Sequence, residues 1–282
     1  LSEILTPLID AVMTSTTHEI ERISQLFTAA SAPDATPDLG SAMEVIIASR
    51  RDETIGEVVQ RDINGLLDDR GVGPSTDGAL RQSVVSAIST LFGASLLNSA
   101  YVDNKHNMID PTALIEVFTI SAQSPVKPAK SAGALRHTAP YQFPTTYDDV
   151  RDALIAASEY VIARTGVHKA TVSRIARRAG VSVGAIYGLY ENKDALVADC
   201  LEVLFPPQSR RDVEEWSRVF TATDQRAVVT DILANYMSPS FAQWRTFRLE
   251  SIVAARHSPD IAAQLAAYTF AARRALMAAA VK

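Results

Sequence analysis

The spacing of apolar residues is the feature that most limits how this chain can fold. They recur at every third or fourth position along most of its 282 residues, the spacing of one face of an α-helix. Runs that alternate between apolar and polar residues, as half-buried strands do, are nearly absent. The spacing predicts an all-α fold, with helices over 4–27, 41–69, 79–101, 111–121, 148–164, 192–205, 225–237 and 241–256.

Turn-forming segments separate the predicted helices. Three of them are SAPDATPDLG (31–40), GVGPSTDG (71–78) and FPPQS (205–209). The strongest boundary is 121–146, where four prolines exclude a regular helix and predict a semi-extended linker. These are Pro125, Pro128, Pro140 and Pro144. We therefore expect two units, roughly 1–122 and 147–282.

Composition is typical of a soluble globular protein, with 47% hydrophobic and 21% charged residues. Cys200 is the single cysteine, which excludes a disulfide framework and suits the reducing cytoplasm. No signal peptide is recognisable at the N-terminus. Residues 82–102 carry no charge, but their seven Ser, Thr and Asn side chains are costly in a bilayer. A buried helix is predicted there rather than a membrane span, and a cytoplasmic location is expected.

Charge is distributed unevenly along the chain. The net charge of -5 argues against a protein that coats nucleic acid indiscriminately. From Arg164 to Lys193, however, there are six basic residues and one acidic residue, Glu191. Such a local excess of positive charge is what a confined nucleic-acid footprint requires. An ordinary solvated helix face would carry the same arginines, so this pattern needs a second signal.

The second signal is the order of caps and turns around the basic residues. Thr171 can cap a short helix, Gly180 supplies the positive φ of a sharp turn, and Ser182 can cap another short helix. A further helix starts near Asn192. Two short helices joined by a glycine turn and buttressed by others form a helix-turn-helix. The small residues Val183, Gly184 and Ala185 would let the second helix enter a major groove about 12 Å wide.

The stretch TVSRIARRAGVSVGAIYGLYENKDAL (171–196) resembles the DNA-binding domain of tetracycline-repressor-type (TetR) transcriptional regulators. The resemblance implies that Thr171, Tyr187 and Lys193 contact phosphates, and that Ser182, Val183 and Ala185 face the bases. Tyr190 stands where the family usually has Phe, and we expect it to serve mostly in packing. Gly188 and Leu189 depart from the family pattern. The full set of candidate DNA-binding residues is Lys169, Thr171, Arg174, Ser182, Val183, Gly184, Ala185, Tyr187, Tyr190 and Lys193.

A weaker internal repeat joins the two halves. Residues 43–59 align without a gap on 249–265, at a shift of 206, with five identical pairs in seventeen. The identical pairs are Glu44/Glu250, Ile46/Ile252, Ala48/Ala254, Arg50/Arg256 and Ile55/Ile261. The segment 247–265 also resembles a helix pair of the family's ligand-binding domain. Two amphipathic, Ala-rich segments can nevertheless match by chance.

If the repeat is a duplication, the chain resembles a tandem regulator. Residues 1–122 would form a first ligand-binding and dimerisation domain that lacks its DNA-binding part, followed by a linker at 123–146. Residues 147–205 would form the helix-turn-helix domain and 206–282 part of a second ligand-binding domain. The counterpart of 171–196 would then lie before Leu1, and that of 79–122 beyond Lys282.

The resemblance also implies partners. The family dimerises through its last two helices, a role that 82–102 and 110–120 would fill in the first unit, either in a homodimer or in an intrachain pseudo-dimer. The expected partners are a double-stranded DNA operator and an unidentified small-molecule effector. Aromatic residues of the second unit could line the effector pocket, although a plain core is the commoner role of such a stripe. They are Trp216, Phe220, Phe241, Trp244 and Phe247.

Signals of catalysis are missing from the sequence. The five histidines are scattered without metal-ligand spacing, and GVGPSTDG lacks the Gly-Lys-Ser/Thr of a phosphate loop. We therefore expect no enzyme activity, metal or cofactor. The predicted function is that of a sequence-specific, ligand-responsive transcriptional repressor. The alternative is a small-molecule-binding or interaction protein whose helix-turn-helix is degenerate.

Overall fold

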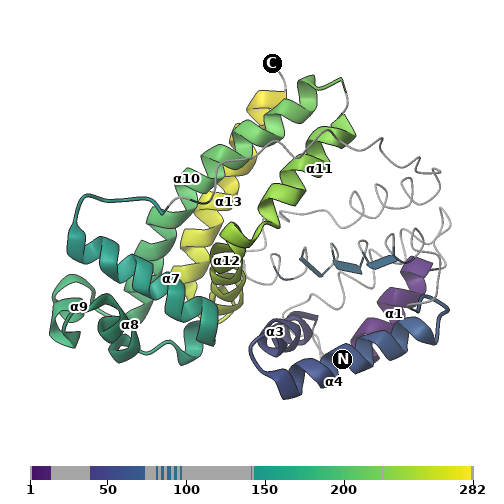
Figure 1. Cartoon of the computed structure of the whole chain (residues 1–282), viewed down its shortest axis with the longest axis horizontal. Coiled ribbons are helices and arrows are strands. Elements are labelled where there is room, and N and C mark those ends of the chain that lie inside the picture. Colours follow the sequence, from purple (N-terminus) through teal and green to yellow (C-terminus); the bar gives the residue numbers. More distant parts are fainter. Residues whose placement is uncertain are drawn as a thin grey trace. The chain divides into compact units, whose positions relative to one another are not determined.

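The computed structural model describes residues 2–13, 39–73, single positions between 81 and 96, residue 141, and residues 143–223 and 225–280. The chain divides into two compact units, Leu1–Lys127 and Pro128–Lys282. Every regular element within the described residues is a helix, which confirms the all-α fold class (Figure 1). Among these helices none has both the length and the apolar character needed to cross a membrane.

In unit 1 the structure describes α1 (Ser2–Met13), α3 (Leu39–Ser49) and α4 (Glu53–Asp68). The single helix expected over 41–69 is wrong, because the chain turns after Ser49 and begins a new helix. Asp52 starts α4 by accepting a hydrogen bond from the Ile55 backbone N–H at 3.1 Å. Helix α1 packs on α4, and their apolar faces join one core of Leu5, Ile9, Leu67, Val72 and Val84.

Several expectations fall outside the described residues. They concern the helix at 111–121, most of those at 4–27 and 79–101, and the linker as far as residue 140. The proposed dimerisation segments 82–102 and 110–120 belong with them, apart from single positions in the first.

In unit 2 the helices follow one another closely along the chain. They are α7 (Asp149–Lys169), α8 (Val172–Ala179), α9 (Val183–Leu189), α10 (Lys193–Thr221), α11 (Gln225–Tyr236), the 3₁₀ turn η1 (Pro239–Phe241), α12 (Ala242–Ala255) and α13 (Pro259–Ala280). Helix α10 packs along α13, and α7 packs on α12 and α8. The shared core includes Leu154, Ile162, Leu201, Phe247 and Ile261, all of them buried. Helix α8 packs on α7 and α9 packs on α8, so this core supports both short helices.

The break predicted at 205–209 is wrong. Helix α10 continues from Lys193 to Thr221, so the expected domain boundary after residue 205 lies within a helix. A proline removes one backbone hydrogen bond and crowds the preceding turn, but it does not oblige a helix to end. Gly166, in contrast, does interrupt α7. Its φ of 76° and ψ of 159° are non-helical, and one further turn leads to Lys169.

Candidate nucleic-acid interface

Side-chain caps set the positions of α8, α9 and α10. Thr171 Oγ1 accepts a hydrogen bond from Arg174 N at 3.3 Å, and Ser182 Oγ accepts one from Ala185 N at 3.0 Å. Asn192 Oδ1 accepts one from Ala195 N at 2.8 Å and so begins α10. Each cap satisfies a backbone donor that the first turn leaves unpaired, so the sequence predicts where each helix starts. All three expected helix starts are confirmed.

Gly180 makes the turn between α8 and α9. It ends α8 in the left-handed region, with φ of 74°, and its N–H bonds to the carbonyl of Ala176. The N–H of Val181 bonds to the same carbonyl at 3.0 Å. This geometry is open to glycine without steric cost. Ile175, Ala176 and Ile186 are buried beneath the turn and hold the two helices to the core.

The outer face of α9 is exposed and carries little side-chain bulk. The side chain of Val183 is 38% exposed and that of Tyr187 is 56% exposed. Gly184 and Gly188 are also exposed. A Cβ added at Gly188 would meet no heavy atom within 4 Å, and one at Gly184 would meet only Ser182 Oγ, at 3.7 Å. A groove edge can therefore approach the backbone of this helix closely.

Several basic side chains on and beside the expected interface are exposed, but they differ in their contacts. Lys169 and Arg174 are exposed, and Arg174 Nη1 donates to the Lys169 carbonyl at 3.3 Å. The guanidinium groups of Arg164 and Arg178 lie over the ring of Tyr160, at 4.3 and 4.0 Å from its centroid. Cation–π contacts of this kind hold the charges in place while leaving them at the surface.

Lys193 has a structural contact that the sequence did not reveal. Its Nζ donates to the carbonyl of Val167 at 2.8 Å, which ties the first turn of α10 to the end of α7. The carbonyl is presented there by the kink at Gly166. An ammonium has three donors, so this bond leaves capacity for a phosphate oxygen.

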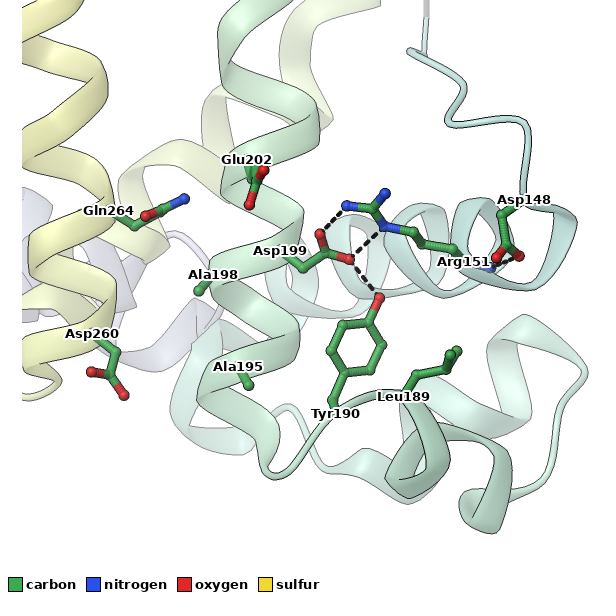
Figure 2. A pocket seen from close by; sticks show the side chains of 10 residues that line it. All are labelled: Asp148, Arg151, Leu189, Tyr190, Ala195, Ala198, Asp199, Glu202, Asp260 and Gln264. Atoms are coloured by element: carbon green, nitrogen blue, oxygen red, sulfur yellow. Dashed lines mark hydrogen bonds and ion pairs between the residues drawn. The ribbon is translucent and has the colours of Figure 1, made fainter.

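Tyr190 is held inside a polar network. Its hydroxyl donates to Asp199 Oδ2 at 2.5 Å, and Arg151 Nε donates to the same oxygen at 2.9 Å. A second guanidinium N–H of Arg151 donates to Asp199 Oδ1. Figure 2 shows Asp199 on α10 between Arg151 of α7 and Tyr190 at the end of α9. Tyr190 was also a candidate DNA-binding residue, but its hydroxyl bonds within the protein, in keeping with the packing role expected for this residue.

The electrostatics of this network favour the ionised carboxylate. Burial works to raise the pKa of Asp199, but the hydrogen bonds from Arg151 and Tyr190 outweigh it, and the pKa lies below its usual value. Burial, and then the hydrogen bond to Asp199, raise the pKa of Tyr190. The tyrosine therefore stays protonated as a donor. Arg151 and Asp199 were not predicted from the sequence. The signal that could have found them is Tyr190 in the place of Phe, because a partly buried hydroxyl needs a hydrogen-bond partner.

An open cleft of about 550 Å³ lies beside this network, between α7, α9, α10 and α13 (Figure 2). Besides Asp199, its walls carry the carboxylates of Asp148, Glu202 and Asp260. Among the described residues of the lining, Arg151 is the one with a basic side chain. The acidic walls oppose phosphate, so the cleft lies outside the basic surface that α8 presents.

The aromatic residues expected to line an effector pocket do not all come together. Phe241, Trp244 and Phe247 are buried core residues. Phe205 packs against Trp244 and Phe247, with ring centroids 5.8 and 6.5 Å apart. Trp216 is partly exposed and Phe220 lies exposed on α10. The three buried rings therefore pack as core.

A buried carboxyl group lies behind the interface, on α7. Glu159 is 1% exposed, and its Oε1 has no hydrogen-bond partner. Burial raises the pKa of Glu159 to about 7, and the nearby polar groups of Gln243 and Tyr141 only partly offset that effect. No group of His, Cys, Asp and Glu side chains within the described part of the chain could hold a metal ion.

Comparison with known proteins gives a family match and a curated relative. Residues 154–200, from α7 to α10, match the family of bacterial regulatory proteins named tetR. The chain is also 31% identical over 110 residues to the HTH-type transcriptional repressor Rv1474c of Mycobacterium tuberculosis (strain ATCC 25618 / H37Rv). That alignment covers 39% of this chain and 53% of the relative, so the chain spans about half the length of the curated relative that it matches. No solved structure gives a significant match.

Proposed function

We propose that the chain is a sequence-specific transcriptional repressor that releases its operator on binding a small molecule, a proposal that the match of residues 154–200 to the tetR family of bacterial regulatory proteins supports. The exposed, nearly bare face of α9 is the observation that carries the proposal. Val183, Gly184 and Ala185 enter the major groove, where Ser182 reaches base edges. The work of such a protein places it in the bacterial cytoplasm.

Phosphate contacts hold the helix in register on the duplex. Thr171 and Tyr187 supply hydroxyl groups, and Lys169, Arg174 and Lys193 supply charge. Contacts of this type give affinity without sequence preference, while the few side chains of α9 that reach base edges give specificity. The exposure of Lys169, Thr171, Arg174 and Tyr187 supports the assignment. Lys193 is half-buried, and its bond to Val167 sets its ammonium at the junction of α7 and α10.

Release depends on the spacing of two such interfaces. A two-fold operator presents half-sites about 34–36 Å apart, so two helix-turn-helix domains must hold that separation. An effector bound among the helices of a ligand-binding domain would shift α10. The network of Arg151, Asp199 and Tyr190 joins α10 to the end of α9, so the shift would reach the DNA-contacting helix. The effector need only bind the released state better.

The test is a charge placed on the proposed groove-facing surface. Val183→Glu should weaken binding to an operator, selected from a random duplex library, by at least about tenfold, because a carboxylate would face the negatively charged groove edge. Fluorescence anisotropy at 0.15 M salt measures the affinity. Met237→Glu is the matched control, since it adds the same charge at an exposed apolar residue that follows α11. It should change the affinity by less than about twofold.

Two results would contradict the proposal. If the library selection yields no duplex that the unaltered chain binds in a salt-dependent manner, the helix-turn-helix is degenerate and the chain is a small-molecule-binding or interaction protein. If Val183→Glu and Met237→Glu bind the operator equally well, α9 is not the element that enters the groove. Equal unfolding temperatures of the two variants would show that each remains folded.

A further inference from the structure

The helix ends of the two units share the register of the sequence repeat. Helix α3 ends at Ser49 and α12 ends at Ala255, while α4 begins at Glu53 and α13 at Pro259. Each of these pairs is separated by the same 206 residues that align the sequences. At this shift α1, Ser2–Met13, falls on the second half of α10. Helix ends played no part in the sequence alignment, so their agreement supports a true duplication in which α3–α4 repeats α12–α13.

Among the described residues, the two copies differ in how far side chains at matching positions are exposed. In unit 2, α7 packs on α12 and α10 packs on α13. Ile261 at the start of α13 is 0% exposed, whereas Ile55, the identical residue at the matching position of α4, is 41% exposed. Val45 of α3 is exposed where its counterpart Ser251 is buried. An isoleucine that is core in one copy is thus surface in the other.

The turn between the two helices repeats this contrast. In unit 2, Ser258 Oγ donates to Asp194 Oδ2 at 2.8 Å, which anchors the turn to the first turn of α10. The matching residue in unit 1, Asp52, is exposed and caps its own helix. Val58 is also exposed, and it corresponds to Gln264, which faces α10 across the cleft (Figure 2). We call Val45, Ile55 and Val58 the bare face of unit 1.

We propose that a second helix-turn-helix domain, built like residues 149–199, packs on the bare face. This domain would belong to the same polypeptide and would directly precede α1. Helix α1 already corresponds to the later half of α10. The elements of unit 2 without a described counterpart in unit 1 are therefore α7–α9 and the first half of α10. In unit 2, α7 packs on α12 and α10 packs on α13, and apolar side chains gain stability from such cover.

A consequence follows for DNA recognition. One polypeptide would carry both helix-turn-helix domains that a two-fold operator requires, so an intrachain pseudo-dimer could fill the role of a homodimer. The inference itself concerns which domain covers the bare face. Its test by unfolding therefore needs no DNA and stands apart from the test of the proposed function.

The natural gene provides the first test. Its reading frame, together with the intact mass of the natural protein, should show a second stretch resembling 171–196 about 35 residues ahead of Leu1, at the register of the repeat. A threonine corresponding to Thr171 and an Ala-Gly-Val-Ser turn would identify it. A natural polypeptide that lacks such a stretch would overturn the proposal.

A pair of matched substitutions provides the second test. In the 1–282 chain, Ile55→Glu should shift the unfolding temperature by less than about 2 °C, whereas Ile261→Glu should lower it by about 10 °C or more, because a buried unpaired charge is among the most destabilising changes. In the natural full-length polypeptide, Ile55→Glu should cause a loss similar to that of Ile261→Glu. Differential scanning calorimetry measures both.

Two outcomes would overturn the proposal. If Ile55→Glu has no effect in the full-length polypeptide, nothing covers the bare face. If Ile55→Glu converts a dimer of the 1–282 chain into a monomer in sedimentation velocity, the occupant is a second copy of this chain. Val85→Glu, at another exposed valine of unit 1, controls for the effect of an added charge alone.

Discussion

At the scale of single residues, Asp199 is the centre of the interface's internal support. Its carboxylate accepts hydrogen bonds from the guanidinium of Arg151 on α7 and from the hydroxyl of Tyr190, the residue that follows α9. A charged acceptor makes such bonds stronger than neutral ones. The neighbouring tyrosine on α9, Tyr187, is exposed instead. The same side chain therefore has different roles three residues apart.

This difference predicts that the same substitution, Tyr to Phe, has a different effect at each of the two positions. Tyr190→Phe should lower the free energy of unfolding by about 1–2 kcal/mol, because it removes a hydrogen bond to a charged group. Tyr187→Phe should leave unfolding unchanged and weaken operator binding about threefold or more, because it removes a proposed phosphate donor. Urea unfolding and anisotropy measure the two quantities. Unchanged unfolding in Tyr190→Phe would show that the network adds no stability.

At the scale of elements, α7 connects the interface to the rest of unit 2. One side packs on α8, another on α12, and its kinked end accepts the Lys193 bond from α10. Glu159 lies on the buried side of α7, near Gln243 of α12, Tyr141 and Cys200. A carboxyl group in such surroundings is easier to bury in its protonated form.

Glu159 should make the stability of unit 2 depend on pH. Its pKa rises from 4.5 to about 7 on folding, so between these values the folded chain keeps a proton that the unfolded chain has lost. The resulting contribution of Glu159 to the free energy of unfolding is fully present below pH 4.5 and is lost as the pH rises through about 7. The loss is on the order of 3 kcal/mol. Urea unfolding at half-unit pH steps would measure it.

The neutral variant isolates this contribution. Glu159→Gln should remove most of the decline between pH 4.5 and 7, because glutamine cannot ionise. Glu191→Gln, at an exposed residue of the turn before α10, should leave the decline in place. Equal slopes in Glu159→Gln and the unaltered chain would mean that Glu159 is ionised in the folded state across this range.

At the scale of the whole molecule, charge is segregated. The chain carries -5 overall, while 164–193 carries six basic residues and one acidic residue. The cleft beside α9, in contrast, is lined by several carboxylate side chains. An acidic protein with one basic surface should bind DNA through few phosphates and release it readily as salt increases.

Individual phosphate contacts can be counted from the salt dependence. Lys169→Ala should weaken binding to every duplex alike and reduce the slope of log affinity against log salt by about one. Arg218→Ala, roughly 35 Å along α10 from its first turn, should change neither. Equal slopes for Lys169→Ala and the unaltered chain would remove Lys169 from the interface.

Local signals in the sequence were enough to predict the helices and their starts in 148–199. Caps, a glycine turn and apolar spacing are local signals, and Thr171, Gly180, Ser182 and Asn192 hold the places that those signals predict. The break predicted from the prolines in 205–209 was wrong, because whether a helix ends at a proline depends on what packs around it. The turn after Ser49 was missed because apolar spacing continues across it.

Tertiary structure alone decided which side chains meet. The bonds of Asp199 join residues 48 and 9 positions apart, and Lys193 reaches a carbonyl 26 residues away. No spacing rule connects such positions, since their distance depends on how α7, α9 and α10 cross. The same holds for burial: Ile55 and Ile261 have the same identity and the same place in the repeat. Only their packing neighbours make one surface and the other core.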